Sequence, residues 1–421
     1  MQSQAEVGTP VTRSSISHVG GDSPGIHLIV FLVFLYTNFA AGYALEDGRI
    51  GVLYVGDYPV RAAPFSIMGS DPLFKMLFVP ASSRGFGGWE LEDVMRSIRL
   101  YMPRTPVEIS TNFDVIVLSD ANSLLVSRYI DLMARAVSED GLGLFMSGGA
   151  ESFGGSSSQP SWGQTAIGQL LPTDDIPGVW VEYVVRMVIT NHDYELIKSL
   201  PWDMNDPTLS APIKWHHNPV TRKPGAEQLA HVVVTSGNHP LMVTWRLEKS
   251  RVFALTSEIH RFWEGEQWDY GYDLGCNLMI HLDDRPVPQD IQLVHAARSK
   301  MIRTTTRRAL LMALLDFTEA FGANTKRMIP LFEEMDEAIS QAGRYYLELH
   351  FDEMLQEYGQ VESIMVEAEQ EAVKLKNETL MWVHITEWLV VTGTAMTVGA
   401  VLWTLMVKRK LYKQVAVTRA S

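Results

Sequence analysis

The stretch of this sequence best suited to chemistry is GLGLFMSGGAESFGG, residues 141–155. An apolar run leads into paired glycines and then into Ser152, a layout typical of a strand-to-helix turn that carries a nucleophile. Residues 150–154 form a G-x-S-x-G motif in which Ala150 replaces the first glycine. Ser152 is therefore a candidate catalytic serine.

A serine nucleophile needs a histidine base and an acid that orients this base. The candidates are His260 with Glu258 in SEIHRFW, and His216 or His217 in KWHHNP. The alternative is that Ser152 caps the following turn while Phe153 fills the core. We favour this alternative because the sequence shows no recognisable order or spacing of a triad.

Four further residues are candidates for binding a ligand: Asp57, Asp120, Gly148 and Gly149. Each lies at the carboxyl end of a predicted buried strand, and the carboxyl ends of parallel strands meet at one edge of a sheet, where ligands bind. The open alternative is that Asp57 and Asp120 cap turns or helices.

Several histidines and one cysteine are also candidates for metal or thiol chemistry. Adjacent histidines rarely share a metal without a third, well-placed ligand, so WHHNP (215–219), His231, His239 and His260 do not predict a metal site. Cys276 lies in the apolar segment GYDLGCNLMIHL, which favours a buried small side chain over a catalytic thiol. We predict neither a metal nor a cofactor.

Composition limits the class of protein. The 421 residues are 46% hydrophobic, enough for one large domain with extra elements or for two domains. The formal net charge of -14 argues against general nucleic-acid binding, which needs clustered Lys and Arg. A single cysteine excludes an intrachain disulfide framework and a cysteine-rich zinc site.

The elements that must position the candidate residues alternate between strands and helices. Buried strands are predicted at 49–59, 113–122 and 142–149, with amphipathic helices at 89–102 and 125–141 between them. This alternation favours a parallel sheet covered on both faces. Closely spaced strands at 181–190, 231–236, 241–247 and 251–257 then predict a mixed region, followed by a helix at 272–283.

Five segments in this order carry a family likeness: GVLYVGDYP, FDVIVLSDAN, GLGLFMSGGAESFGG, IGQLLP (167–172) and MVTWRLEKSRVFALTSEIHRFW. Together they resemble the type 1 glutamine amidotransferase-like domain, in particular its membrane-associated branch, and more distantly the ThuA-like proteins. The resemblance covers about residues 49–283. It implies an α/β fold with a flavodoxin-like, doubly wound sheet.

The resemblance also implies a chemistry that this sequence lacks. Glutamine amidotransferases of this type use a cysteine on a G-x-C-x-G turn and a His-x-Glu pair, and the thiolate attacks the amide. Here Ala150 stands in the nucleophile position of Gly148–Ser152, and NHPL at 238–241 lacks the glutamate. We therefore expect no glutaminase activity, and a fold name alone does not transfer one.

Two apolar segments predict the compartment. Residues 26–44 suit a signal peptide or an N-terminal anchor, and residues 388–407 contain no charge and precede the basic KRKLYK. Trp382 and Trp388 fit an aromatic belt, and the basic tail fits the positive-inside rule. We predict a single- or double-pass protein of the cell membrane, with the α/β domain outside the cytoplasm and the C-terminus inside.

A helical connector is predicted at residues 291–379. Apolar or small residues from 335 to 375 recur in steps of four and three, a coiled-coil pattern with a register skip between Leu349 and Met354. About 50 helical residues would span roughly 75 Å. Because this segment is acidic and residues 298–308 are basic, it either folds back as an antiparallel hairpin or forms a solvated stalk.

The predicted organisation has five parts: a signal peptide or anchor (1–44), an α/β domain (45–290), a connector (291–379), a transmembrane helix (380–407) and a basic cytoplasmic tail (408–421). The favoured function is a membrane-anchored module that binds or assembles without glutaminase chemistry. The alternative is an extracytoplasmic serine hydrolase using Ser152. The connector is also a candidate surface for a homo-oligomer or a membrane-protein partner.

Overall fold

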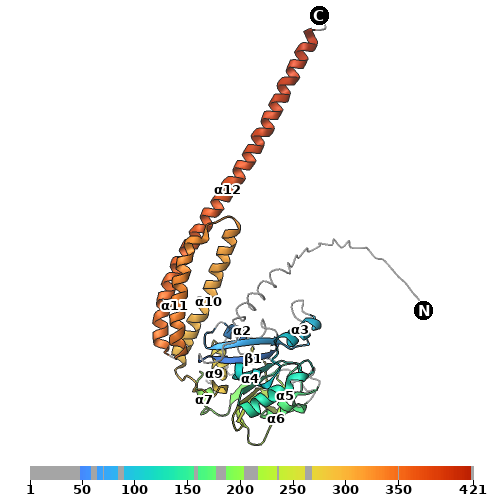
Figure 1. The fold of residues 1–421 in the computed structure, drawn as a ribbon, viewed down its shortest axis with the longest axis vertical. Coiled ribbons are helices and arrows are strands. Elements are labelled where there is room, and N and C mark those ends of the chain that lie inside the picture. Colours follow the sequence, from blue (N-terminus) through green and yellow to red (C-terminus); the bar gives the residue numbers. More distant parts are fainter. Residues whose placement is uncertain are drawn as a thin grey trace, which may run out of the picture. The chain divides into compact units, whose positions relative to one another are not determined.

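An eight-stranded mixed sheet forms the centre of the α/β domain (Figure 1). The computed structural model describes residues 48–57, 64–69, 71–83, 90–155, 160–176, 186–202, 217–234, 237–260, 268–348 and 350–418. The strands of the sheet are β1 (Ile50–Gly56), β2 (Phe74–Pro80), β3 (Val115–Ser119), β4 (Gly143–Ser147), β6 (Arg186–Ile189), β8 (Glu227–Val234), β9 (Gly237–Arg246) and β10 (Arg251–Leu255). A separate pair joins β5 (Thr173–Asp175) and β7 (Val220–Arg222).

The spatial order of the sheet is β2-β1-β3-β4-β10-β9-β8-β6. The first five strands are parallel, and β9, β8 and β6 continue the sheet with antiparallel pairings. The parallel part has the flavodoxin-like order, with β10 as its fifth strand. The predicted α/β fold and its mixed region are confirmed.

Each parallel strand alternates its side chains between two cores. In β1, Val52 and Tyr54 face one core, whereas Leu53 and Val55 face the other. This two-sided burial explains why the strands are almost continuously apolar in sequence, since both faces of the sheet are covered.

Helices cover both faces. The core that contains Leu53 includes residues of α3 (Leu91–Tyr101), α4 (Pro106–Asn112), α5 (Ile130–Arg135) and α6 (Ala166–Leu170). The core that contains Val52 includes residues of α2 (Phe65–Met68), α7 (Glu195–Lys198), α9 (Gly271–Leu282) and the C-terminal helices. Short helical turns are η2 (Ser127–Tyr129), η3 (Ala136–Asp140), η4 (Trp162–Gln164) and η5 (Thr325–Met328).

Three long helices follow the sheet: α10 (Ile291–Ala320), α11 (Ile329–Leu347) and α12 (Phe351–Thr418). They lie side by side, and α12 then continues beyond the other two (Figure 1). The predicted four-three seam is what α11 and α12 bury. Its buried members are Met335, Ala342, Tyr346, Met354, Tyr358, Val361, Met365, Ala368, Ala372 and Leu375.

The connector differs from the prediction of one rod of about 50 residues. The register skip between Leu349 and Met354 is a reversal of the chain, because α11 ends at Leu347 and α12 begins at Phe351. The acidic segment therefore gives two helices rather than one. The acidic segment packs against the basic helix α10, in agreement with the hairpin alternative. Only α11 is antiparallel to α10, however, whereas α12 runs parallel to it.

Ion pairs fix the register of these helices. Lys300 contacts Glu362 at 3.1 Å and Arg307 contacts Glu369 at 2.9 Å, so both pairs join α10 and α12 at the same offset along the chain. Arg308 of α10 contacts Asp336 of α11 at 2.9 Å. The basic and acidic segments thus neutralise each other within the bundle.

A buried polar network joins the bundle to the α/β domain. Asp71 accepts hydrogen bonds from Tyr272 of α9 at 2.8 Å and from Tyr346 of α11 at 2.9 Å. Arg298 of α10 donates to Asp273 of α9 at 2.9 Å, and both side chains are buried. Burial raises the pKa of Asp71, and these donors satisfy its oxygens. The two parts therefore share one packed and hydrogen-bonded core.

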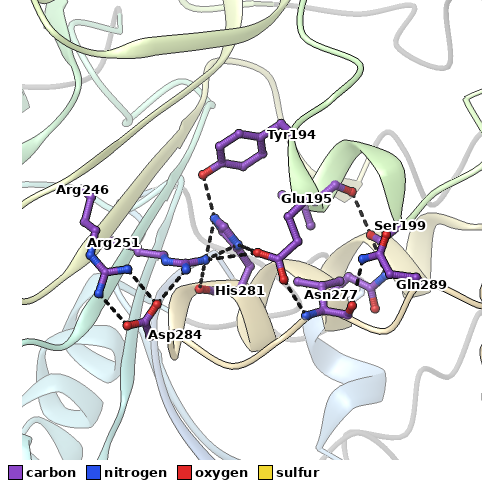
Figure 2. A network of polar contacts seen from close by, with 11 residues as sticks. Tyr194, Glu195, Ser199, Arg246, Arg251, Asn277, His281, Asp284 and Gln289 are labelled. Atoms are coloured by element: carbon purple, nitrogen blue, oxygen red, sulfur yellow. Dashed lines mark hydrogen bonds and ion pairs between the residues drawn. The ribbon is translucent and has the colours of Figure 1, made fainter.

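A second network joins the end of α9 to β10 and α7 (Figure 2). Arg251 contacts Nδ1 of His281 at 2.6 Å and Asp284 at 2.7 Å, and Tyr194 contacts Nε2 of His281 at 2.9 Å. Arginine can only donate, so Nδ1 of His281 is an unprotonated acceptor. Burial and the neighbouring Arg251 lower the pKa of His281 to about 4.

Candidate functional site at the carboxyl edge of the sheet

The predicted site residues follow the carboxyl ends of neighbouring parallel strands. Asp57 follows β1, Asp120 follows β3 and the 148–152 segment follows β4. Their backbones meet: the N–H of Asp57 donates to the carbonyl of Ser119 at 2.9 Å, and the N–H of Glu151 donates to Oδ1 of Asp120 at 2.6 Å. The structure thus brings these segments together at one edge of the sheet.

The two glycines after β4 are required by close packing. A Cβ on Gly148 would lie 2.5 Å from the carbonyl oxygen of Thr256. Gly149 has a φ of +153°, and a Cβ there would lie 2.3 Å from Oδ1 of Asp120. Asn218 bonds both backbone groups of Gly149, accepting from its N–H at 2.8 Å and donating to its carbonyl at 3.0 Å. The glycines therefore allow three chain segments to approach one another.

Backbone strain in this region lies beside Ala150 rather than on it. Among the described residues, the non-glycine residues with positive φ are Asp120, Phe153 and Asp284. Asp120 and Phe153 have φ values of 51° and 50°, in the left-handed region. A strained turn is thus present, but its strained positions carry an aspartate and a buried phenylalanine.

Ser152 is enclosed. The residue is only 1% exposed, and its Oγ accepts a hydrogen bond from the backbone N–H of Asp120 at 3.1 Å. Among the described residues, no histidine forms a hydrogen bond with the Ser152 hydroxyl. Phe153 is fully buried in the core, as the favoured alternative predicted for it.

His260 and Glu258 lie close together, with 3.3 Å between Nε2 of His260 and Oε2 of Glu258. Both follow β10 and reach the same edge of the sheet as Ser152. The geometry thus joins the predicted base to the predicted acid, without the hydrogen bond from the base to the nucleophile that a triad needs.

The described hydrogen bond of His217 is to Thr256 rather than to Ser152. The hydroxyl of Thr256 donates to the carbonyl of Pro240 at 2.7 Å, so Nδ1 of His217, 2.8 Å from the same hydroxyl, is the donor to it. Burial and the nearby His239 lower the pKa of His217 to about 3, so the ring is neutral. The neighbouring Asn218 contacts Gly149. His216 lies outside the described residues.

Glu151 is a central residue that the sequence did not single out. It is fully buried, and its carboxylate accepts from the N–H of Ser83 at 2.9 Å, from the hydroxyl of Ser83 and from the amide of Asn122 at 2.6 Å. These donors follow β2 and β3, so one carboxylate joins the loops after three strands. The available signal was a charge between small and apolar residues in GGAESFGG.

Cys276 does not have the properties of a reactive thiol. It is fully buried in α9, as predicted, and burial raises the pKa of its thiol well above the usual value. A protonated, enclosed thiol is a poor nucleophile. No group of three or more His, Cys, Asp or Glu side chains within the described ranges is placed to hold a metal ion.

The comparisons with known proteins agree with this architecture. Residues 101–283 match the family model GATase1_like, described as "Putative glutamine amidotransferase". The match begins after β1 and β2, which belong to the same sheet. No curated protein matches the chain. The chain therefore contains a glutamine amidotransferase-like domain, built on the flavodoxin-like sheet described above.

Proposed function

We propose that the chain is a membrane-anchored module whose glutamine amidotransferase-like domain binds a partner or ligand outside the cytoplasm and performs no glutaminase chemistry. One observation carries this proposal: the hydrogen-bonding groups of Glu151 and Ser152, where the reactive turn would lie, are engaged within the protein and enclosed.

The residues at the turn support the absence of thiol chemistry. Glutaminase activity requires a thiolate within reach of a histidine base. Ala150 has no reactive group, and the single cysteine lies in α9 with a raised thiol pKa. Gly148 donates its N–H to the carbonyls of Leu255 and Ser257. A ligand at this edge would therefore contact exposed parts of the surrounding loops, with the partly exposed Asp57 as a predicted contributor, whereas Asp120 is buried.

Helix α12 supports the membrane anchor. It is the helix, among the residues described, that is long and apolar enough to cross a membrane. Residues 388–407 number 20 and would span about 30 Å, the thickness of the hydrocarbon layer. The side chains of this segment are exposed, and Lys408, Arg409 and Lys410 follow it. A basic flank favours the cytoplasmic side.

The shared core connects the membrane helix firmly to the α/β domain. Helix α12 begins in the bundle, and the bundle is joined to the α/β domain through Asp71, Tyr346 and Arg298. A binding event on the domain would thus act on a body packed against the membrane helix. The predicted leader or anchor at residues 26–44 lies outside the described residues, and either form would place the domain outside.

Thiol labelling in intact cells tests the proposed topology. Val107→Cys places a thiol on the exposed part of α4, and Arg409→Cys places one after the span. The native Cys276 is buried and provides the unlabelled background. A membrane-impermeant maleimide should label Val107→Cys in intact cells and Arg409→Cys only after permeabilisation. Labelling of Arg409→Cys but not of Val107→Cys in intact cells would show that the topology is the reverse of the proposed one.

A further inference from the structure

Helix α10 carries an apolar strip that the bundle does not cover. Leu310, Leu314, Phe317 and Phe321 recur at intervals of four, three and four, so they share one helix face. Leu310, Phe317 and Phe321 are 67%, 49% and 48% exposed. The rings of Phe317 and Phe321 are in contact, with centroids 4.9 Å apart. An exposed aromatic pair is unusual on a soluble bundle and points to a surface that is covered in the cell.

The ion pairs of the bundle give the height of this strip along α12. Arg307 and Glu369 are 62 positions apart, as are Lys300 and Glu362. Because α10 and α12 run parallel, the same offset places Phe321 level with Val383 and Phe317 level with Thr379. Arg327, in the turn between α10 and α11, contacts both Glu371 and Glu378 of α12 at 3.0 Å, so this turn also lies along the upper part of the bundle.

This height matches the edge of the proposed span. Val383 precedes Trp388 by five residues, which corresponds to about 8 Å along a helix. The polar layer outside the hydrocarbon is roughly 5–8 Å thick on each side of a bilayer. On the proposed span, Phe321 would lie at the outer edge of the lipid headgroups, and Phe317, one helical turn further from the membrane, would lie outside them. The exposed Met381 and Trp382 of α12 lie at the same level.

We infer that the tip of the bundle, comprising Phe321, Met381 and Trp382, contacts the headgroup layer of the bilayer into which α12 inserts. Aromatic side chains prefer this layer because their rings are amphipathic. The contact rests on the proposed membrane span. It would limit tilting of the bundle on the membrane surface and so fix the height of the glutamine amidotransferase-like domain.

Depth-dependent quenching of single thiol labels tests this contact. The full chain carrying Phe321→Cys, Phe317→Cys or Leu310→Cys is labelled with an environment-sensitive fluorophore and placed in phosphatidylcholine nanodiscs containing brominated acyl chains. Leu310 is a matched control on the same strip, since it is level with Ala372, about 24 Å from Trp388. Quenching should be measurable at position 321 but weaker than inside the span, weaker still at 317 and absent at 310.

Two further sites separate the inference from the proposed function. Leu402→Cys reports on the span and Val107→Cys on the distal domain, and both native side chains are exposed. Quenching at 402 without quenching at 321 overturns the tip contact and leaves the span intact. Absence of quenching at 402 refutes the span and the tip contact with it. A signal at 321 that is insensitive to brominated lipid but lost on dilution assigns the strip to a second copy of the chain and overturns the lipid contact.

Discussion

Tyr346 in α11 donates a hydrogen bond of 2.9 Å to the buried carboxyl group of Asp71, which precedes β2 and lies 275 positions earlier in the chain. The same hydroxyl lies 3.3 Å from Nε of Arg298 in α10. One tyrosine thus connects the first β-α-β region of the sheet with two helices of the bundle. The bundle is therefore part of the folded core rather than a spacer.

Removing this connection should destabilise the whole fold. Tyr346→Phe deletes one donor to Asp71 and should lower the free energy of unfolding by about 1–3 kcal/mol. Arg298→Met removes the guanidinium from the buried Asp273, which keeps His295 as a partner at 2.7 Å, and should cost about 3 kcal/mol, the lower end for breaking a buried ion pair. Denaturant unfolding measures both losses.

The matched control is Arg135→Met, which removes an exposed ion pair with Glu139 at 3.3 Å. It should change the free energy of unfolding by less than about 1 kcal/mol. Equal effects of Arg298→Met and Arg135→Met would show that the buried network contributes nothing to stability.

Glu151 should matter for stability more than its unremarkable sequence context suggests. Glu151→Gln places an amide N–H₂ against the donors of Ser83 and Asn122, so a buried donor loses its acceptor. We expect a loss of about 2–3 kcal/mol in the free energy of unfolding. Glu248→Gln, at an exposed position, is the control and should be neutral. A neutral Glu151→Gln would mean that the loops after β2, β3 and β4 are not joined through this carboxylate.

The pH dependence of stability should carry a contribution from His281 (Figure 2). Its pKa is about 4 in the folded protein, below the ordinary value of 6.5. The unfolded chain therefore takes up the proton first, and this contribution to stability is lost as pH falls from about 6.5 to about 4. Its full size is roughly 3 kcal/mol.

Asp283 opposes this trend, because burial raises its pKa to about 6. Its contribution to the stability of the fold therefore falls as pH rises from 3.8 to about 6. The difference between wild type and His281→Gln isolates the histidine. The variant should lose less stability than wild type between pH 7 and pH 4.5 in thermal unfolding. His350→Gln, at a largely exposed position, should follow wild type. Parallel curves for His281→Gln and wild type would contradict the assignment.

Much of the fold was predictable because the pattern of apolar residues in the sequence matches the pattern of burial in the strands and helices. The strands that end at Gly56, Ser119 and Ser147 are buried on both faces and therefore read as unbroken apolar runs. By contrast, β2 was not predicted. It contains Lys75 and lies at the edge of the sheet, where one side has no partner strand among the described residues and the apolar pattern is weaker.

The connector shows why a heptad pattern alone is ambiguous. A seam in steps of four and three predicts which side chains are buried, but not whether a skip is a local adjustment or a reversal. The segment between Leu347 and Phe351 contains neither glycine nor proline, so no residue type marked the turn. The opposite charges of Arg307 and Glu369 were the better guide, since they paired across helices.

The site was predictable in position but not in detail. The strand ends placed Asp120 and Ser152 at one edge correctly, because parallel strands share a direction. The role of Glu151 depends on Ser83, 68 positions away, and no local pattern encodes such a contact. The enclosure of Ser152 likewise follows from tertiary packing.

The reactivity of Ser152 shows whether this edge of the sheet performs chemistry. The full chain, folded in detergent or nanodiscs, is treated with a fluorophosphonate probe, and the 141–155 region is examined by mass spectrometry, with Ser152→Ala as the control. The same sample is assayed for ammonia released from glutamine. We expect no adduct on Ser152 and no ammonia above the variant's level. A stoichiometric adduct on Ser152, or turnover that disappears in Ser152→Ala, would contradict it.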